Sequence, residues 1–128
     1  MMTVKEALLG KCITSVEISD SRDIITFITT EGAVKLYAEG DCCSTTWIES
    51  LDDEQALFGT VQDVENLPML DLGSIPTHHH QNVDVISYYG LKITTEKGRC
   101  VIDYRNDSNG YYGGALVTEQ ELRGWTWR

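Results

Sequence analysis

Basic residues, prolines and long apolar runs are all scarce in this sequence. Its 128 residues carry 20 acids against 10 Lys and Arg, which gives a formal net charge of −10. Such a balance argues against direct binding of nucleic acid, which needs a basic face. Two prolines argue against a linker-rich or disordered chain. No stretch reaches the roughly 18 continuous apolar residues that cross a membrane, so we expect no membrane partner.

The signatures of common enzyme classes are missing as well. The chain has no Gly-x-Ser-x-Gly elbow, no Walker loop, no Rossmann fingerprint and no His-Glu-x-x-His motif. A thiol and a loop histidine could form a nucleophile and base, but nothing in their spacing supports that pair. We therefore expect no enzymatic activity, no catalytic residues and no cofactor.

The length and the start of the chain indicate one cytoplasmic domain that spans residues 1–128. That length lies within the usual range of a single domain. The first ten residues are too short and too charged for a secretory signal. Because cytoplasmic thiols are normally reduced, all four cysteines are expected to be free: Cys12, Cys42, Cys43 and Cys100.

The acids are unevenly distributed along the chain. No Lys or Arg lies between Lys35 and Lys92, yet this stretch holds half of the acids: Glu39, Asp41, Glu49, Asp52, Asp53, Glu54, Asp63, Glu65, Asp71 and Asp84. A solvated acidic face is the simpler interpretation. The alternative is an acidic contact surface that imitates a phosphate backbone and binds a basic protein.

Hydrophobic patterning predicts an α+β fold. Thr3-Val-Lys-Glu6 has the form of a capping box, which predicts a short N-terminal helix. Alternating β-branched and aromatic residues predict a three-stranded meander over residues 11–19, 23–30 and 33–38. Further strand patterns follow in the second half of the chain, at residues 60–67, 83–95, 99–105 and 111–119.

Between these strand regions, residues 44–59 have a helical pattern. The start signals are Thr46-x-x-Glu49 and Ser50-x-x-Asp53, and Gly59 is a suitable stop. We therefore predict a mainly antiparallel sheet of six to seven strands, with one or two short helices inserted after the third strand.

The most distinctive string, Gly40-Asp-Cys-Cys-Ser-Thr-Thr-Trp-Ile-Glu49, lies where a strand is predicted to give way to a helix. Backbone N–H groups and hydroxyls at such a junction can hold a polar ligand. The candidate binding residues here are Asp41, Cys42, Cys43, Ser44 and Trp47. In the simpler interpretation the cysteines are small core residues, Ser44 is a cap and Trp47 packs beneath.

A second candidate segment is Asn106-Asp-Ser-Asn-Gly-Tyr-Tyr-Gly-Gly114. Tyrosine offers a flat apolar face with a polar end, and glycine allows close backbone approach. This mixture suits a small planar ligand, with Ser108, Asn109, Tyr111 and Tyr112 as binding residues and Arg99 or Arg105 as the phosphate neutraliser. A tight turn leading into a strand explains the same residues without a ligand.

The alternative function is a Cys/His metal-binding protein, with or without hydrolytic activity. His78-His-His80 supplies imidazoles, and Cys42, Cys43 or Asp84 could complete a ligand set. An exposed histidine loop that takes up metal adventitiously is the simpler interpretation, so we assign no metal ligands.

Four strings give the chain a resemblance to a known family: Gly10-Lys-Cys-Ile-Thr-Ser-Val-Glu17, Asp41-Cys-Cys-Ser-x-x-Trp-Ile-Glu49, Ile93-Thr-Thr-Glu-Lys-Gly98 and Ser108-Asn-Gly-Tyr-Tyr-Gly113. The chain resembles small uncharacterised proteins of bacteriophages and of bacteria that carry phage-derived genes. The resemblance implies a phage accessory protein in the host cytoplasm, but no mechanism.

The leading hypothesis is a non-enzymatic phage accessory protein that inhibits a host defence by binding. It would either sequester a small nucleotide-like signal or bind a basic host protein through its acidic surface. Exposed strand edges in a small sheet protein also allow a homodimer.

Overall fold

The computed structural model describes residues 3–40, 45–70, 85–108 and 114–121 of the chain. In order, its elements are α1 (Val4–Leu8), β1 (Ile13–Ile18), β2 (Ile24–Thr29), β3 (Gly32–Gly40), β4 (Thr45–Leu51), the 3-10 helix η1 (Glu54–Leu57), β5 (Val61–Leu70), β6 (Val85–Thr95), β7 (Gly98–Ser108) and β8 (Gly114–Thr118). They form two antiparallel four-stranded sheets, ordered β1-β2-β3-β8 and β4-β7-β6-β5.

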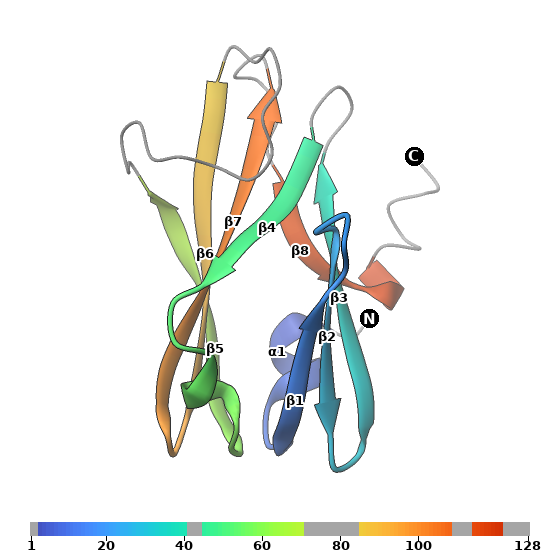
Figure 1. Cartoon of the computed structure of the whole chain (residues 1–128), viewed down its shortest axis with the longest axis vertical. Helices are drawn as coiled ribbons and strands as arrows, with labels where there is room; N and C mark the ends of the chain where they lie inside the picture. The colour runs from blue at the N-terminus through green and yellow to red at the C-terminus, as the bar shows by residue number, and fades with distance from the viewer. Residues whose placement is uncertain (1–2, 41–44, 71–84, 109–113, 122–128) are drawn as a thin grey trace.

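The two sheets stand face to face as a sandwich, and the hydrophobic core lies between them (Figure 1). One sheet contributes Ile25, Phe27 and Leu36, and the other contributes Ile48, Ile93 and Ile102, all with 0% exposure. These residues alternate with more exposed ones along β2 and β7, as expected for strands with one buried face.

The prediction of an α+β fold with a single sheet is wrong. The described ranges hold eight strands in two sheets, and their helices are α1, η1 and a single turn at residues 119–121. The error lies mainly at residues 45–51, which form β4 rather than a helix. There the hydroxyl of Thr46 donates to Asn106 Oδ1 at 2.8 Å, and Glu49 accepts from Trp47 Nε1 at 3.0 Å. The side chains of Thr46 and Glu49, which the sequence marked as a helix start, therefore form hydrogen bonds within and next to a β-strand pair.

Two local predictions are confirmed. The capping box of α1 is present, because Thr3 Oγ1 accepts from the Glu6 amide and Glu6 Oε1 accepts from the Thr3 amide, each at 3.2 Å. The meander is also present, since β2 pairs antiparallel with both β1 and β3. In each case the signal lies within a few neighbouring residues.

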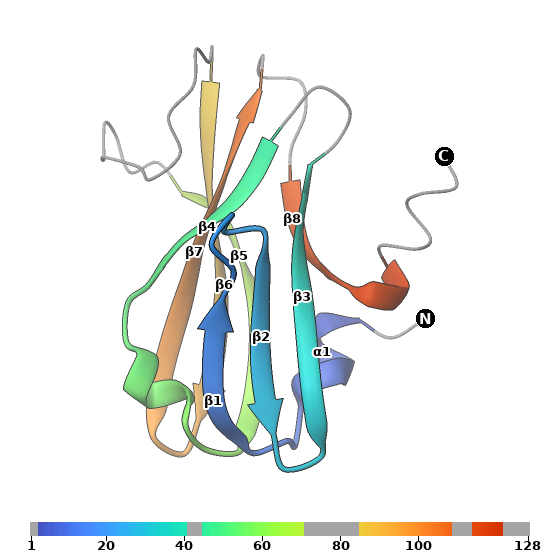
Figure 2. The same cartoon turned by 45° about the vertical axis from the view of Figure 1, so that its right-hand side comes forward.

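The two sides of the sandwich are closed differently. On the β4 side, Arg22 Nε donates to the Ile48 carbonyl at 2.7 Å, and Nη2 donates to the Glu49 carbonyl. The Ile48 amide in turn donates to the Arg22 carbonyl at 2.7 Å. On the other side, α1 contacts β5, β8 and β3 (Figure 2). No described helix is long and apolar enough to span a membrane.

Candidate functional site

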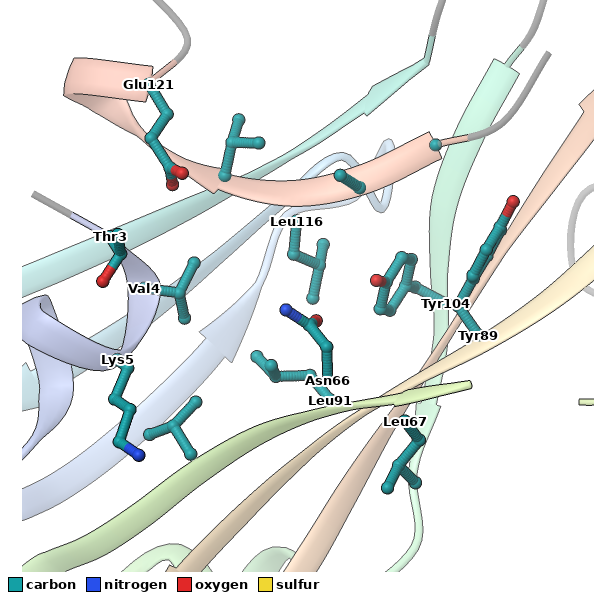
Figure 3. A pocket seen from close by; sticks show the side chains of 14 residues that line it. Thr3, Val4, Lys5, Asn66, Leu67, Tyr89, Leu91, Tyr104, Leu116 and Glu121 are labelled. Atoms are coloured by element: carbon teal, nitrogen blue, oxygen red, sulfur yellow. The ribbon is translucent and has the colours of Figure 1, made fainter. Parts of the chain in front are cut away.

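A groove of about 600 Å³ lies between β5 of one sheet and β8 of the other, with α1 at one end (Figure 3). Its walls are largely apolar and include side chains of the core itself: Val4, Val64, Leu91 and Leu116. The volume falls within the roughly 300–1,000 Å³ typical of small-molecule pockets. The groove therefore offers an apolar surface that a ligand of modest size can cover.

Two stacked tyrosines line the groove away from α1. The rings of Tyr89 and Tyr104 have centroids 5.3 Å apart and planes at 15°. Tyr104 is buried and Tyr89 is half-buried. Burial and, to a lesser extent, the neighbouring Tyr89 raise the pKa of Tyr104 to about 12, although a backbone hydrogen bond from Leu116 opposes the shift. Tyr104 therefore stays protonated at physiological pH, and its ring forms an aromatic platform with that of Tyr89.

Asn66 breaks the apolar pattern of the groove. It lies opposite the buried Leu91 in the β5–β6 pairing, on the face of β5 that lines the groove, but Asn66 itself is exposed. Figure 3 shows its amide directed into the groove between Leu91 and Leu116. Within the described part of the chain, this amide has no hydrogen-bond partner. It therefore presents two donors and an acceptor to whatever occupies the groove.

The charged groups at the rim are already engaged. Lys5 Nζ lies 3.1 Å from Asp63 Oδ1, and this ion pair lowers the pKa of Asp63. Glu121 Oε1 accepts from the Thr118 amide at 3.0 Å, and Thr118 Oγ1 accepts from the Glu121 amide at 3.2 Å. These two residues form a second capping box, at the turn after β8. The groove thus favours an uncharged ligand over a phosphate.

The sequence-predicted pocket is only partly described by the structure. Seven of its residues lie outside the described ranges: Asp41, Cys42, Cys43, Ser44, Asn109, Tyr111 and Tyr112. Ser108 is the last residue of β7. Trp47 and Arg105 are direct partners across β4 and β7, whereas Arg99 lies six residues earlier along β7. At roughly 3.3 Å per residue, the two arginines are about 20 Å apart.

Arg105 is committed to a buried polar network. Its guanidinium pairs with Asp103 at 2.9 Å, lies 3.9 Å from Glu49 and covers the ring of Tyr88 at 4.8 Å. Burial lowers the pKa of Arg105, but Asp103 and Glu49 outweigh that effect and raise it. Arg105 and Trp47 are each 2% exposed, and neither lines the groove. Arg99 is exposed and does not line it either.

The acids of the stretch between Lys35 and Lys92 lie in different environments. Glu49 is 5% exposed and accepts from Trp47, so it presents no carboxylate to a partner. Asp63 and Glu65 are paired with Lys5 and Lys92. Asp52, Asp53 and Glu54 are exposed next to one another at η1. Asp41, Asp71 and Asp84 lie outside the described ranges.

The thiols and histidines bear on the metal hypothesis. Across the described ranges, no group of three or more Cys, His, Asp or Glu is arranged to hold a metal. The residues of that hypothesis, His78, His79, His80, Cys42, Cys43 and Asp84, lie outside these ranges. Cys100 is free and buried. Burial raises its pKa to about 11, which makes it a structural thiol rather than a nucleophile.

Sequence reasoning missed the groove and three of the polar residues that line it, Asn66, Tyr89 and Tyr104. One signal for Tyr104 was available, because Cys100, Ile102 and Tyr104 alternate on one face of a predicted strand. Asn66 gave no such signal. The register of β5 shifts between Val61 and Asp63, so simple alternation from Val61 puts Asn66 on the wrong face.

Comparison with known proteins places the chain in a family. Residues 6–118 match the family model described as a domain of unknown function, DUF7448, and the chain belongs to that family. It is 30% identical over 81 residues to uncharacterized protein L278 of Acanthamoeba polyphaga mimivirus. That match covers 63% of the chain and 64% of the viral protein, which is less than two thirds of that relative's length. No solved structure matches the chain.

Proposed function

We propose that this chain is a non-enzymatic viral accessory protein, of phage origin, that binds a small planar ligand in the groove between β5 and β8. One observation carries the proposal: the Asn66 amide, without a partner in the described chain, lies beside the stacked Tyr89–Tyr104 pair in an apolar groove. Asn66 is exposed, so its amide is accessible to a ligand that enters the groove and can exchange its hydrogen bonds with water for bonds to that ligand.

The chemistry of the lining selects a nucleobase or a nucleoside. An aromatic platform stacks on a planar ring, and apolar walls cover its edges. The carboxamide of Asn66 donates and accepts at once, as the hydrogen-bonding edge of a base requires. The rim offers Lys5, already paired with Asp63, as its positive charge. The base is therefore the part of a nucleotide-like ligand that this groove suits.

A protein that holds such a ligand without altering it lowers its free concentration. In an infected cell, this would weaken a host defence that signals through a base-containing small molecule. The viral relative supports a viral setting, and the net charge of −10 argues against nucleic acid as the natural ligand.

The first test is native mass spectrometry of the untagged protein purified from infected host cells. A retained mass of nucleobase or nucleoside size is the expected result, and it would name the ligand. A retained metal ion would favour the Cys/His alternative instead. Bare protein that also fails to bind added nucleosides would contradict the proposal and direct attention to the acidic surface at η1.

A further inference from the structure

A second cavity, of about 220 Å³, opens beside α1 and is separate from the groove in its lining residues. It is bounded by Ala7 of α1, by the first residues of β3 and by the chain that leaves β8. Two lysines, Lys11 and Lys35, line it. In a chain with twice as many acids as bases, two ammonium groups at one cavity are notable.

Neither lysine is neutralised within the described chain. Lys5 and Lys92 form ion pairs with Asp63 and Glu65 at 3.1 and 2.9 Å. Lys11 and Lys35 have no such partner among the described residues. Glu119 also lines the cavity and adds one carboxylate. The lining thus carries two ammonium groups against one carboxylate, and its net charge is positive.

The backbone of β3 adds a second feature. The pairing of β3 with β8 begins at Leu36 opposite Thr118, so residues 32–35 extend beyond the end of β8. Ala33, Val34 and Lys35 of this extension line the cavity. A strand edge that is not covered by a neighbouring strand exposes backbone N–H groups, which can donate to an anion.

We propose that this cavity is a binding site for a phosphate-type oxyanion, held by the ammonium groups of Lys11 and Lys35. Two positive charges that line one cavity repel each other, and a bound dianion offsets that repulsion while forming charge-assisted hydrogen bonds. The volume is several times the roughly 30 Å³ that one water occupies in the liquid, so a tetrahedral oxyanion fits. The site does not depend on the proposed role of the groove.

The test titrates inorganic phosphate, and separately methyl phosphate, into the protein at constant ionic strength by calorimetry. The variants are the double substitution Lys11→Ala with Lys35→Ala, and Lys97→Ala as the matched control. Lys97 is exposed at the β6–β7 turn and lies outside the cavity. We expect the double variant to bind at least about tenfold more weakly, with the control unchanged. Circular dichroism verifies that each variant is folded.

The preferred titrant identifies the source of the anion. Tighter binding of methyl phosphate indicates the phosphate group of a larger ligand, and tighter binding of inorganic phosphate indicates the free ion. Equal affinity of the wild type and the double variant would overturn the proposal, as would absence of binding by the wild type at about 50 mM of either titrant, well above the millimolar range of weak sites. Asn66→Leu should leave this affinity unchanged, which separates the cavity from the groove.

Discussion

Tyr104 and Tyr89 stack across β7 and β6, and this pair joins the hydrophobic core to the wall of the groove. The inner ring, Tyr104, packs within the core cluster and is 4% exposed. The outer ring, Tyr89, packs against that cluster and is partly accessible. Because the core fixes the inner ring, a ligand would meet an aromatic surface that is already ordered.

Alkaline pH should destabilise the protein through two buried groups. The pKa is raised from 9.0 to about 11 at Cys100 and from 10.0 to about 12 at Tyr104. A raised pKa means that each contribution is complete below the unfolded value and is lost as pH rises toward the folded value. Each group then costs on the order of 2 kcal/mol between about pH 9 and 12.

Urea unfolding between pH 8 and 11 measures this loss. In Cys100→Ala, which retains only Tyr104 of the two buried groups, the fall in unfolding free energy between pH 9 and 10 should be smaller. An identical fall in the wild type and the variant would show that Cys100 is not the group that titrates.

Removal of Arg105 should be among the most damaging single substitutions. Arg105→Ala leaves Glu49 buried without its nearby cation and removes the partner of Asp103. Breaking a buried pair by deleting one member costs about 3–5 kcal/mol. Arg99→Ala, on the same strand but exposed, should change the unfolding free energy by less than about 0.5 kcal/mol. Comparable losses in the two variants would contradict a structural network at Arg105.

Gly114 is required by its contact with Thr46. A Cβ at Gly114 would lie 2.1 Å from Thr46 Oγ1, the hydroxyl that donates to Asn106. Gly114→Ala should therefore cost about 1–3 kcal/mol of unfolding free energy, since the hydroxyl must move. The double variant Gly114→Ala with Thr46→Ala should lose less unfolding free energy than the sum of the losses in the two single variants. Strict additivity in thermal or urea unfolding would show that the two residues do not compete for space.

The N-cap of α1 should matter for both stability and the groove. Thr3→Ala removes the hydroxyl that accepts from the Glu6 amide, which costs about 1 kcal/mol at an N-cap. Thr3→Ser keeps that oxygen and should retain most of the stability. Equal losses in the two variants, measured by urea unfolding, would mean that the cap does not hold α1 at the end of the groove.

Local signals predicted the local structure well. The capping box of α1 and the alternation of β1 to β3 depend on side chains a few residues apart, so the sequence alone was sufficient. β4 was mistaken for a helix because Trp47, Ile48 and Glu49 are buried in succession, which hides the alternation of a strand. The strand conformation of that segment depends on partners about 60 residues away in the sequence, as the Thr46–Asn106 hydrogen bond illustrates.

The division into two sheets and the site between them depend on long-range pairing. β8 pairs with β3 rather than with β7, which precedes it, and this crossing creates the groove. Asn66 reaches the groove because an irregularity near Val61 shifts the faces of β5. Neither feature leaves a pattern in neighbouring residues. The site predicted at Asn109, Tyr111 and Tyr112 lies outside the described residues, and the proposed site uses Asn66, Tyr89 and Tyr104 instead.

The most direct test of the groove is a titration of Asn66→Leu with adenosine, guanosine, cytidine and uridine. Leucine keeps approximately the size of asparagine but removes the amide, and the control Gln62→Leu makes the same kind of change at an exposed position of β5 outside the groove. We predict that at least one nucleoside binds the wild type and Gln62→Leu alike, and that Asn66→Leu weakens it about tenfold or more without loss of thermal stability. Equal binding by the two leucine variants, or no binding of any nucleoside to the wild type, would contradict the account.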